Sequence, residues 1–340
     1  MLLDVTLPVD ANPLPIAARV AAAAEELGFG ALWAPETAHN PFLPLALAAE
    51  HTGRIALGTA VAIAFPRSPM VTAQVAWDLA AMSRGRFILG LGTQVRAHIE
   101  RRFSAQFDQP VARMRDYILA LRAIWNCWQT GEPLRYRGQF YQHTLMTPFF
   151  NPGKIEHPHV PIYIAGVNSG LAQLAGELCE GFHAHPFNSA KYLREQLRPQ
   201  IAAGAAKSGR DPSACSVAGS AFVITGADTA QREQLRALVR QQLSFYASTP
   251  SYRPVLECHG WGEVGEQLSQ LAAQQRWAEM PALISEEMLA TFAVEADPAD
   301  LGPAVYERFN GLLDRVSLYM PFVPGQMDDF WRGIVRALSR

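Results

Sequence analysis

Residues 55–79, IALGTAVAIAFPRSPMVTAQVAWDL, contain one complete strand and helix unit. The first eleven residues are apolar almost throughout, which is typical of a strand with both faces covered by other elements. Ser68 then provides a helix N-cap, and Pro69 suits the first helical position. We expect the buried face of this helix to contain Val71, Val75 and Leu79. The stretch therefore predicts a parallel sheet covered by helices.

Units of this kind recur along the whole chain. Besides residues 55–65, strands are predicted at 4–7, 31–35, 86–94, 161–166, 182–187, 215–226 and 315–320, with helical patterns between them. Eight alternations of strand and helix predict an α/β fold, a (β/α)8 TIM barrel with right-handed crossovers. An open doubly wound sheet, which more often has five or six strands, is the second choice.

Two segments interrupt this rhythm. Residues 132–160, after the fourth strand, are rich in proline, and residues 248–313 separate the seventh strand from the eighth. The second segment contains Tyr252, His259 and Trp261, and we expect it to form a lid or a dimer contact. We therefore predict a single domain, residues 1–340, with both segments inserted outside the barrel.

Composition narrows the class of protein. The chain has 340 residues, of which 49% are hydrophobic and 18% charged, so it can bury one large core. A net charge of −2 with scattered Lys and Arg argues against nucleic acid or an anionic membrane as a partner. The longest apolar stretch, at residues 56–65, is too short to span a bilayer, and the N-terminus does not resemble a signal peptide. The four cysteines form no C-x-x-C pair. We expect a cytoplasmic protein with reduced cysteines.

Candidate catalytic groups follow the second strand. In this fold the active site lies on the loops that follow the strands. Glu36 and His39 are the obvious acid/base pair there, because histidine titrates near neutral pH and a carboxylate three residues away can orient it. Purely structural roles explain them equally well, as a loop histidine bonded to the backbone and a glutamate at a helix N-terminus.

Glycine-rich loops follow the fourth and fifth strands. Residues 90–93 let the backbone approach a bound group, and Thr93 and Gln94 can donate hydrogen bonds. Residues 166–170 offer free amides at the start of a helix. Taken alone, Gly-x-Gly near a strand end more often reflects backbone packing or a turn.

Other side chains at the strand ends allow two more interpretations. Trp33, Phe42 and Phe65 could stack on a planar ring or could simply pack. His183 and His185 share one strand face and could begin a metal site. No matching Asp or Glu follows the other strands, so we expect no metal.

Three segments, WAPETAHNPFLPLALAAEHTGRIALGTAVAIAFPRSP (33–69), GRFILGLGTQVRAHIERRF (85–103), and PIYIAG with GLAQLAGELCEGF (161–182), resemble the luciferase-like monooxygenase superfamily, specifically its coenzyme F420-dependent branch. In such proteins the third strand ends in a bulge with a non-prolyl cis peptide behind the cofactor's central ring. The resemblance places that bond at Ala60–Val61. It assigns further cofactor contacts to Gly92, Thr93, Gln94, Val95, Ala165, Gly166, Val167 and Asn168.

The resemblance also implies an activity. Glu36 matches the acidic position after the second strand, but Thr37 stands where the family usually has a histidine, and His39 follows two places later. We expect hydride transfer between F420 and a small organic substrate, in a homodimer, with His39 as the general acid/base and Glu36 as its partner or replacement. The alternatives are a reduced-FMN monooxygenase, a non-enzymatic flavin-binding protein and a metal-dependent hydrolase.

Overall fold

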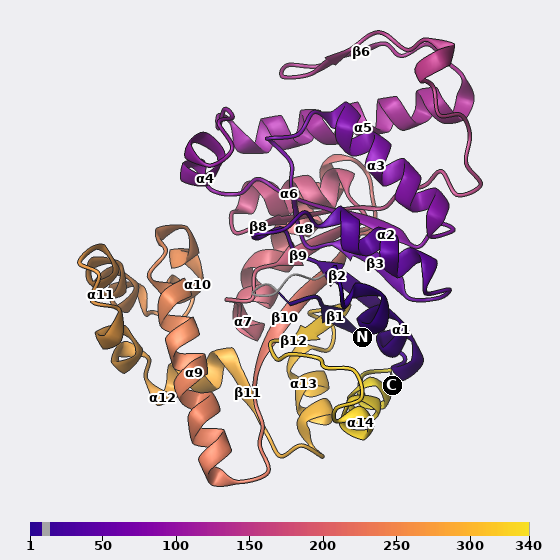
Figure 1. Ribbon diagram of the computed structural model, residues 1–340. Coiled ribbons are helices and arrows are strands. Elements are labelled where there is room, and N and C mark those ends of the chain that lie inside the picture. Colours follow the sequence, from indigo (N-terminus) through magenta and orange to yellow (C-terminus); the bar gives the residue numbers. More distant parts are fainter. Residues whose placement is uncertain (9–13, 340) are drawn as a thin grey trace.

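Eight parallel strands close into a barrel in the computed structural model, which describes residues 1–8 and 14–339 (Figure 1). Pairing of β9 with β10 and of β12 with β1 completes the ring. The barrel prediction is confirmed, and the open doubly wound sheet is wrong. The barrel strands are β1 (Leu2–Thr6), β2 (Ala31–Ala34), β3 (Ala56–Thr59), β5 (Phe87–Gly92), β8 (Ile162–Gly166), β9 (Gly181–Ala184), β10 (Ser216–Ile224) and β12 (Arg315–Leu318).

The third predicted strand is in fact two short strands. β3 is followed by β4 (Ala62–Ile63), which pairs with β5. The peptide bond between Ala60 and Val61, at the break, is cis. The cis bond predicted from the resemblance is therefore confirmed.

Helices cover the outside of the barrel, with ends close to those predicted. At the end of the first helix Gly28 has φ 90°, and at the start of the third the Ser68 side chain accepts a hydrogen bond from the Met70 amide at 3.2 Å. The main helices are α1 (Ala17–Leu27), α2 (Phe42–Glu50), α3 (Pro69–Met82), α5 (Pro110–Thr130), α6 (Ser169–Leu178), α8 (Arg198–Lys207), α9 (Thr229–Ala247), α13 (Leu301–Phe309) and α14 (Asp328–Leu338).

The predicted buried face of α3 is wrong in one respect. Val71 is 55% exposed, whereas Thr72, Ala76 and Leu79 are buried. The helix turns its small residues inward, where it packs against α5 and β5. Small side chains on the inner face let the helix backbone come close to α5 and β5. This close packing, more than the hydrophobicity of Val71, decides which face of the helix is buried.

The barrel interior holds an ion pair next to an aromatic cluster. Asp4 bonds the Arg315 guanidinium at 2.8 and 2.9 Å and also accepts a hydrogen bond from the Trp33 indole at 2.8 Å. Trp33 packs with Tyr163, at a ring separation of 5.9 Å. These contacts link the first and last strands at the barrel's closure.

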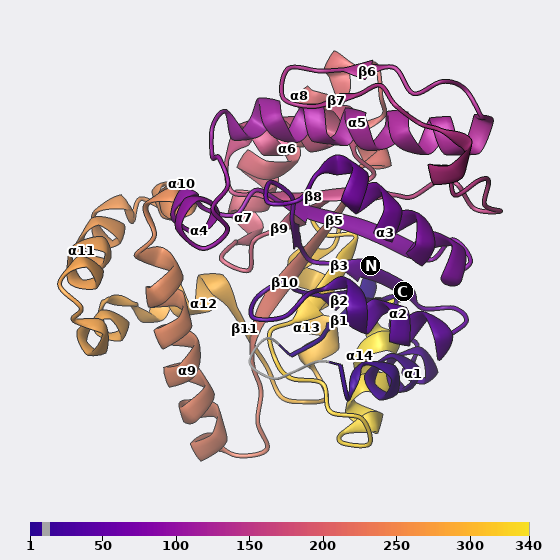
Figure 2. The same ribbon diagram turned by 45° about the horizontal axis from the view of Figure 1, so that its top comes forward.

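The two inserted segments lie outside the barrel. Residues 132–160 form the hairpin of β6 (Tyr136–Arg137) and β7 (Gln142–His143), which the buried Asp116 of α5 ties down through the amides of Phe140 and Tyr141. The second segment contains α10 (Arg253–Glu257), α11 (Gly262–Ala273), α12 (Glu286–Phe292) and β11 (Ala293–Glu295). With α9, these helices form a lobe beside the barrel (Figure 2). β11 extends the sheet from β10, a pairing that the sequence analysis did not foresee. No described helix is long and apolar enough to cross a membrane.

Candidate functional site

Small residues gather at the C-terminal ends of β3, β5 and β8. In register, Gly92 lies beside Ile63 of β4 on one side and Ala165 of β8 on the other. A Cβ atom on Gly92 would approach Val61 Cγ2 to 2.4 Å, so the position accepts no larger side chain without displacing Val61. The fold therefore brings Ala60, Val61, Gly92 and Ala165 together, and we call these four residues the small-residue arc.

The polar side chains of the loop after β5 form hydrogen bonds with the loop's own backbone. Gln94 has φ 55°, and its Oε1 accepts a hydrogen bond from the Val95 amide at 2.9 Å. Thr93 Oγ1 donates to the Gln94 carbonyl at 3.2 Å. Val95 is exposed. These residues lie next to the arc, and the loop takes its shape from internal bonds.

The loop after β8 leads directly into α6. Asn168 is the helix N-cap, and its Oδ1 accepts a hydrogen bond from the Leu171 amide at 2.9 Å. Gly166 and Val167 are partly buried between the strand and this cap. The amides of Ser169 and Gly170 precede the hydrogen-bond ladder of the helix, so they are the donors that this loop can offer to an anion.

Glu36 is engaged in a different contact from the one expected. Its two carboxylate oxygens accept hydrogen bonds from the Arg67 guanidinium, at 2.7 Å each, and Oε2 also accepts from the Ile63 amide at 2.7 Å. The Glu36 side chain is only 7% exposed. The carboxylate thus fastens the loop after β2 to β4, and none of its described contacts involves His39.

His39 lies on the same loop and is exposed. Nearby, the Arg102 guanidinium donates a hydrogen bond to the Thr37 carbonyl, which joins this loop to the segment after β5. The structure therefore places His39 at the rim of the strand ends, apart from the anchored carboxylate of Glu36.

The aromatic residues that the sequence placed near the strand ends are packed in the protein. Trp33 is 2% exposed inside the barrel, and Phe42 and Phe65 are also buried. Their burial leaves none of the three rings free for stacking, and arginine side chains lie over them, Arg315 over Trp33, Arg67 over Phe42 and Arg113 over Phe65. Ordinary packing is the correct interpretation for them.

A different group of aromatic residues lies above β9, β10 and β12, on the side of the barrel opposite β3. His185, directly after β9, stacks on Tyr252 at 4.2 Å and meets Tyr246 edge-on at 4.7 Å. Tyr246 shares a hydrogen bond with Tyr319 at 3.0 Å, and Tyr319 packs on Phe222 at 4.5 Å. We call these five residues the aromatic arc.

Sequence reasoning identified only part of the aromatic arc. It singled out His185 as a possible metal ligand and placed Tyr252 in a lid or dimer contact. Tyr246 and Tyr319 gave no signal, because they are 73 residues apart and meet only when β12 returns beside β10. The alternation of side chains along β12, which starts from the interior Arg315, could have pointed to Tyr319.

His183 lies inside the barrel between the two arcs. It is next to Ala165 in register, meets Trp33 edge-on at 4.7 Å and lies 5.3 Å from the Tyr163 ring. Burial, with a smaller effect from Arg315, lowers its pKa to about 3. Its Nε2 is buried and has no hydrogen-bond partner among the described residues. Such an orphaned polar atom is uncommon in a folded protein, and this one lies close to Gly90 of β5.

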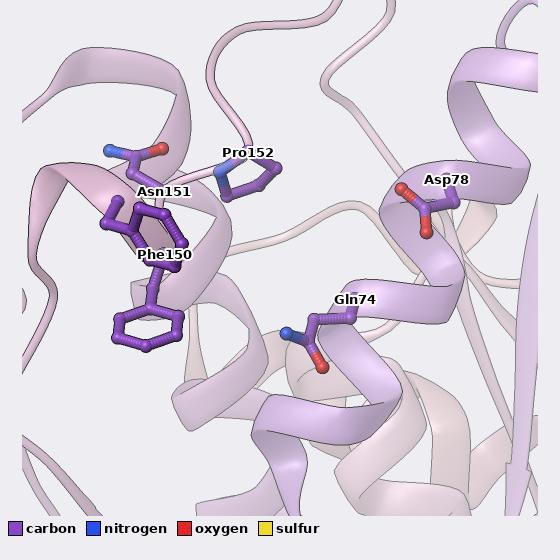
Figure 3. Close-up of a pocket in the computed structure, with 6 residues that line it drawn as sticks. Gln74, Asp78, Phe150, Asn151 and Pro152 are labelled. Carbon is purple, nitrogen blue, oxygen red and sulfur yellow. The ribbon is translucent and has the colours of Figure 1, made fainter.

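The described residues form no metal centre, and one surface recess lies away from the strand ends. Within residues 1–8 and 14–339, no group of three or more His, Cys, Asp or Glu side chains could hold a metal ion. A surface recess of about 320 Å³ lies between Gln74 and Asp78 of α3 and residues 149–152 (Figure 3). It is on the outer face of the helix, away from the strand ends, and beside it Phe149 is 88% exposed.

Comparison with known proteins assigns this barrel to a family. Residues 4–315 match the luciferase-like monooxygenase family, so the chain belongs to that family. An uncharacterised protein of Mycobacterium tuberculosis is 46% identical over 92% of each chain. The F420-dependent glucose-6-phosphate dehydrogenase of Intrasporangium calvum is 30% identical over 55% of this chain and 58% of that enzyme.

A solved structure shares the fold. The coenzyme F420 dependent tetrahydromethanopterin reductase from Methanopyrus kandleri superposes with a TM-score of 0.78 at 20% identity, over 99% of this chain and 98% of that one. The family resemblance stated from the sequence is confirmed.

Proposed function

We propose that the chain is an oxidoreductase that binds coenzyme F420 on the small-residue arc and transfers a hydride between it and a small organic substrate. The observation that carries the proposal is the arc itself. These four small residues lie side by side at the ends of β3, β5 and β8, and Ala60, Val61 and Ala165 are partly exposed, so a flat ring could rest on them. The name of the Intrasporangium calvum relative supports F420 as the cofactor.

The residues present fit such a group. The small-residue arc offers a surface without bulky side chains, and the orphaned Nε2 of His183 lies on the barrel side of the arc. The first amides of α6 and those of Thr93 and Gln94 are suitable donors for the anionic part of the cofactor, whereas the Val95 amide already donates to Gln94. When bound, the deazaflavin ring supplies the carbon that accepts or donates the hydride.

The protein's own part is to position the reactants and move a proton. Glu36 and Arg67 hold the bend of β4 that forms one side of the arc. His39 remains our first choice for the general acid/base, because it is a titratable side chain on the same loop. Since both oxygens of Glu36 are engaged, we assign Glu36 to holding this loop in place more than to exchanging a proton.

Two other functions use the same barrel. A reduced-FMN monooxygenase is the first alternative, and the name of the family favours it. A flavin-binding protein without activity is the second. Titration of the purified chain with F420 and with FMN, followed by absorbance, separates the F420-dependent oxidoreductase from the reduced-FMN monooxygenase. Turnover assays separate either enzyme from the inactive flavin-binding protein. The expected homodimer stays a prediction, which light scattering would test.

A further inference from the structure

The aromatic arc faces the small-residue arc across the barrel, and its chemistry indicates what it could bind. The strand order places β9, β10 and β12 together on one side and β3, β5 and β8 on the other, with β1 and β2 completing the ring. A molecule held over a cofactor on the small-residue arc would therefore lie against His185 and the three tyrosines. This inference rests on the proposed function.

The geometry of His185 fixes which nitrogen carries its proton. The Phe187 amide donates a hydrogen bond to Nδ1 at 3.1 Å, so Nδ1 is an acceptor. The turn is held by Asn188, whose side-chain nitrogen donates to the His185 carbonyl at 2.7 Å. In the neutral ring the proton must then be on Nε2, which becomes a fixed hydrogen-bond donor.

That donor is available to a ligand. His185 Nε2 has no hydrogen-bond partner among the described residues, and unlike Nε2 of His183 it is not fully buried. The ring itself cannot turn away easily, because Tyr252 covers one face and Tyr246 meets its edge. A ligand oxygen would therefore meet a donor that is already oriented.

The surroundings of this donor are uncharged. None of the described contacts of His185, Tyr246, Tyr252 or Tyr319 involves Lys, Arg, Asp or Glu. Burial lowers the pKa of His185 to about 4 and raises the pKa values of Tyr246 and Tyr252, so all three are neutral at pH 7. A charged ligand would lose hydration here without gaining a partner of opposite charge.

We propose that the aromatic arc is the substrate site and that it selects an uncharged molecule with an apolar ring, whose carbonyl oxygen accepts a hydrogen bond from Nε2 of His185. Because the arc offers no charge to pair with an anion, phosphorylated sugars and carboxylates are excluded as substrates. His185 holds the oxygen in place and is not the proton source, because its Nδ1 is occupied by the Phe187 amide and its Nε2 proton is that of a neutral imidazole.

The test compares two probes of similar shape, acetophenone and benzoate, by ligand-observed NMR on the full chain at pH 7.5, without and with F420. We expect saturable binding of acetophenone and at least roughly tenfold weaker binding of benzoate. His185→Phe, which keeps the stack on Tyr252 but removes the donor, should weaken acetophenone by roughly three- to tenfold, and His185→Gln should restore part of the loss.

Three results would overturn the inference: benzoate binding as tightly as acetophenone, no saturable binding of acetophenone, or unchanged binding in His185→Phe. Imidazole 15N spectra give a second measurement. The wild type should show the signals of a neutral imidazole protonated at Nε2 that are missing from the spectrum of His185→Phe. The acetophenone comparison without cofactor decides the inference even if neither F420 nor FMN binds, a result that would instead overturn the proposed function. Equal F420 affinity in wild type and variants shows that the fold is intact.

Discussion

Glu36 and Arg67 form a two-pronged ion pair across the ends of β2 and β4, with both nitrogen to oxygen distances at 2.7 Å. Arg67 Nη1 also donates to the Ile63 carbonyl at 2.8 Å, and the Ile63 amide donates to Glu36. The pair therefore encloses the short strand that follows the cis bond. Its position makes it a support for the small-residue arc.

Replacing Glu36 by Gln should destabilise the protein. The change leaves the partly buried Arg67 without its counter-charge, and we expect a loss of about 1–3 kcal/mol in the free energy of unfolding, with weaker cofactor binding. Arg67→Lys keeps the positive charge but cannot make both hydrogen bonds to the carboxylate, so it should lower the free energy of unfolding by a smaller amount. Urea unfolding measures both. If Glu36→Gln keeps the stability of the wild type but loses the acidic limb of the wild-type pH–rate profile, Glu36 is instead a catalytic carboxylate.

His39→Ala tests the proton-transfer assignment. His39 is exposed, so the substitution should change the free energy of unfolding by no more than about 0.5 kcal/mol. Turnover at saturating cofactor should fall by roughly 10²- to 10⁴-fold. His157→Ala, at another exposed histidine, is the control and should keep full activity. If turnover is unchanged in both His39→Ala and Glu36→Gln, neither residue is the general acid/base.

Gly92→Ala should damage the small-residue arc selectively. The added Cβ would lie 2.4 Å from Val61 Cγ2, so Val61 must shift at the surface where the ring is proposed to rest. We expect roughly tenfold or greater loss of F420 affinity with a folded protein. Gly53→Ala is the matched control, because nothing lies within 4 Å of its added Cβ. Equal affinities in the two variants would remove Gly92 from the cofactor site.

Acid should destabilise the protein through His183 and His185, two partly buried histidines. Burial lowers the pKa to about 3 for His183 and to about 4 for His185, below the value near 6.5 of an unfolded histidine. The unfolded chain therefore binds more protons as the pH falls below 6.5, so the stability present above that pH is lost toward pH 4. Each histidine contributes up to about 1.4 kcal/mol per pH unit.

Urea unfolding between pH 7.5 and 4 measures this slope. His183→Phe and His185→Phe should each flatten it, since each removes one buried site that the unfolded chain protonates. Arg315, the charged group that bears on His183, stays protonated throughout this range. A wild-type slope that neither variant changes would assign the acid sensitivity to other groups.

The sequence predicted the barrel well because the fold depends on local patterns. Apolar strands, Ser68 as a cap and Gly28 as a helix end are each visible within a few residues. The family resemblance located the cis bond at Ala60–Val61. The contacts that shape the site are not local: Glu36 meets Arg67 31 residues later, and Tyr246 meets Tyr319 only through the closure of the barrel. Pairings of this kind follow from strand order and register, which the alternation of strands and helices leaves open.

Titration of the full chain with F420 and with FMN, monitored by absorbance and fluorescence, tests the central proposal most directly. We predict saturable F420 binding, at least roughly tenfold weaker binding of FMN, and a loss of F420 affinity in Gly92→Ala but not in Gly53→Ala. Tight binding of FMN with no binding of F420, or binding of neither, would contradict the account.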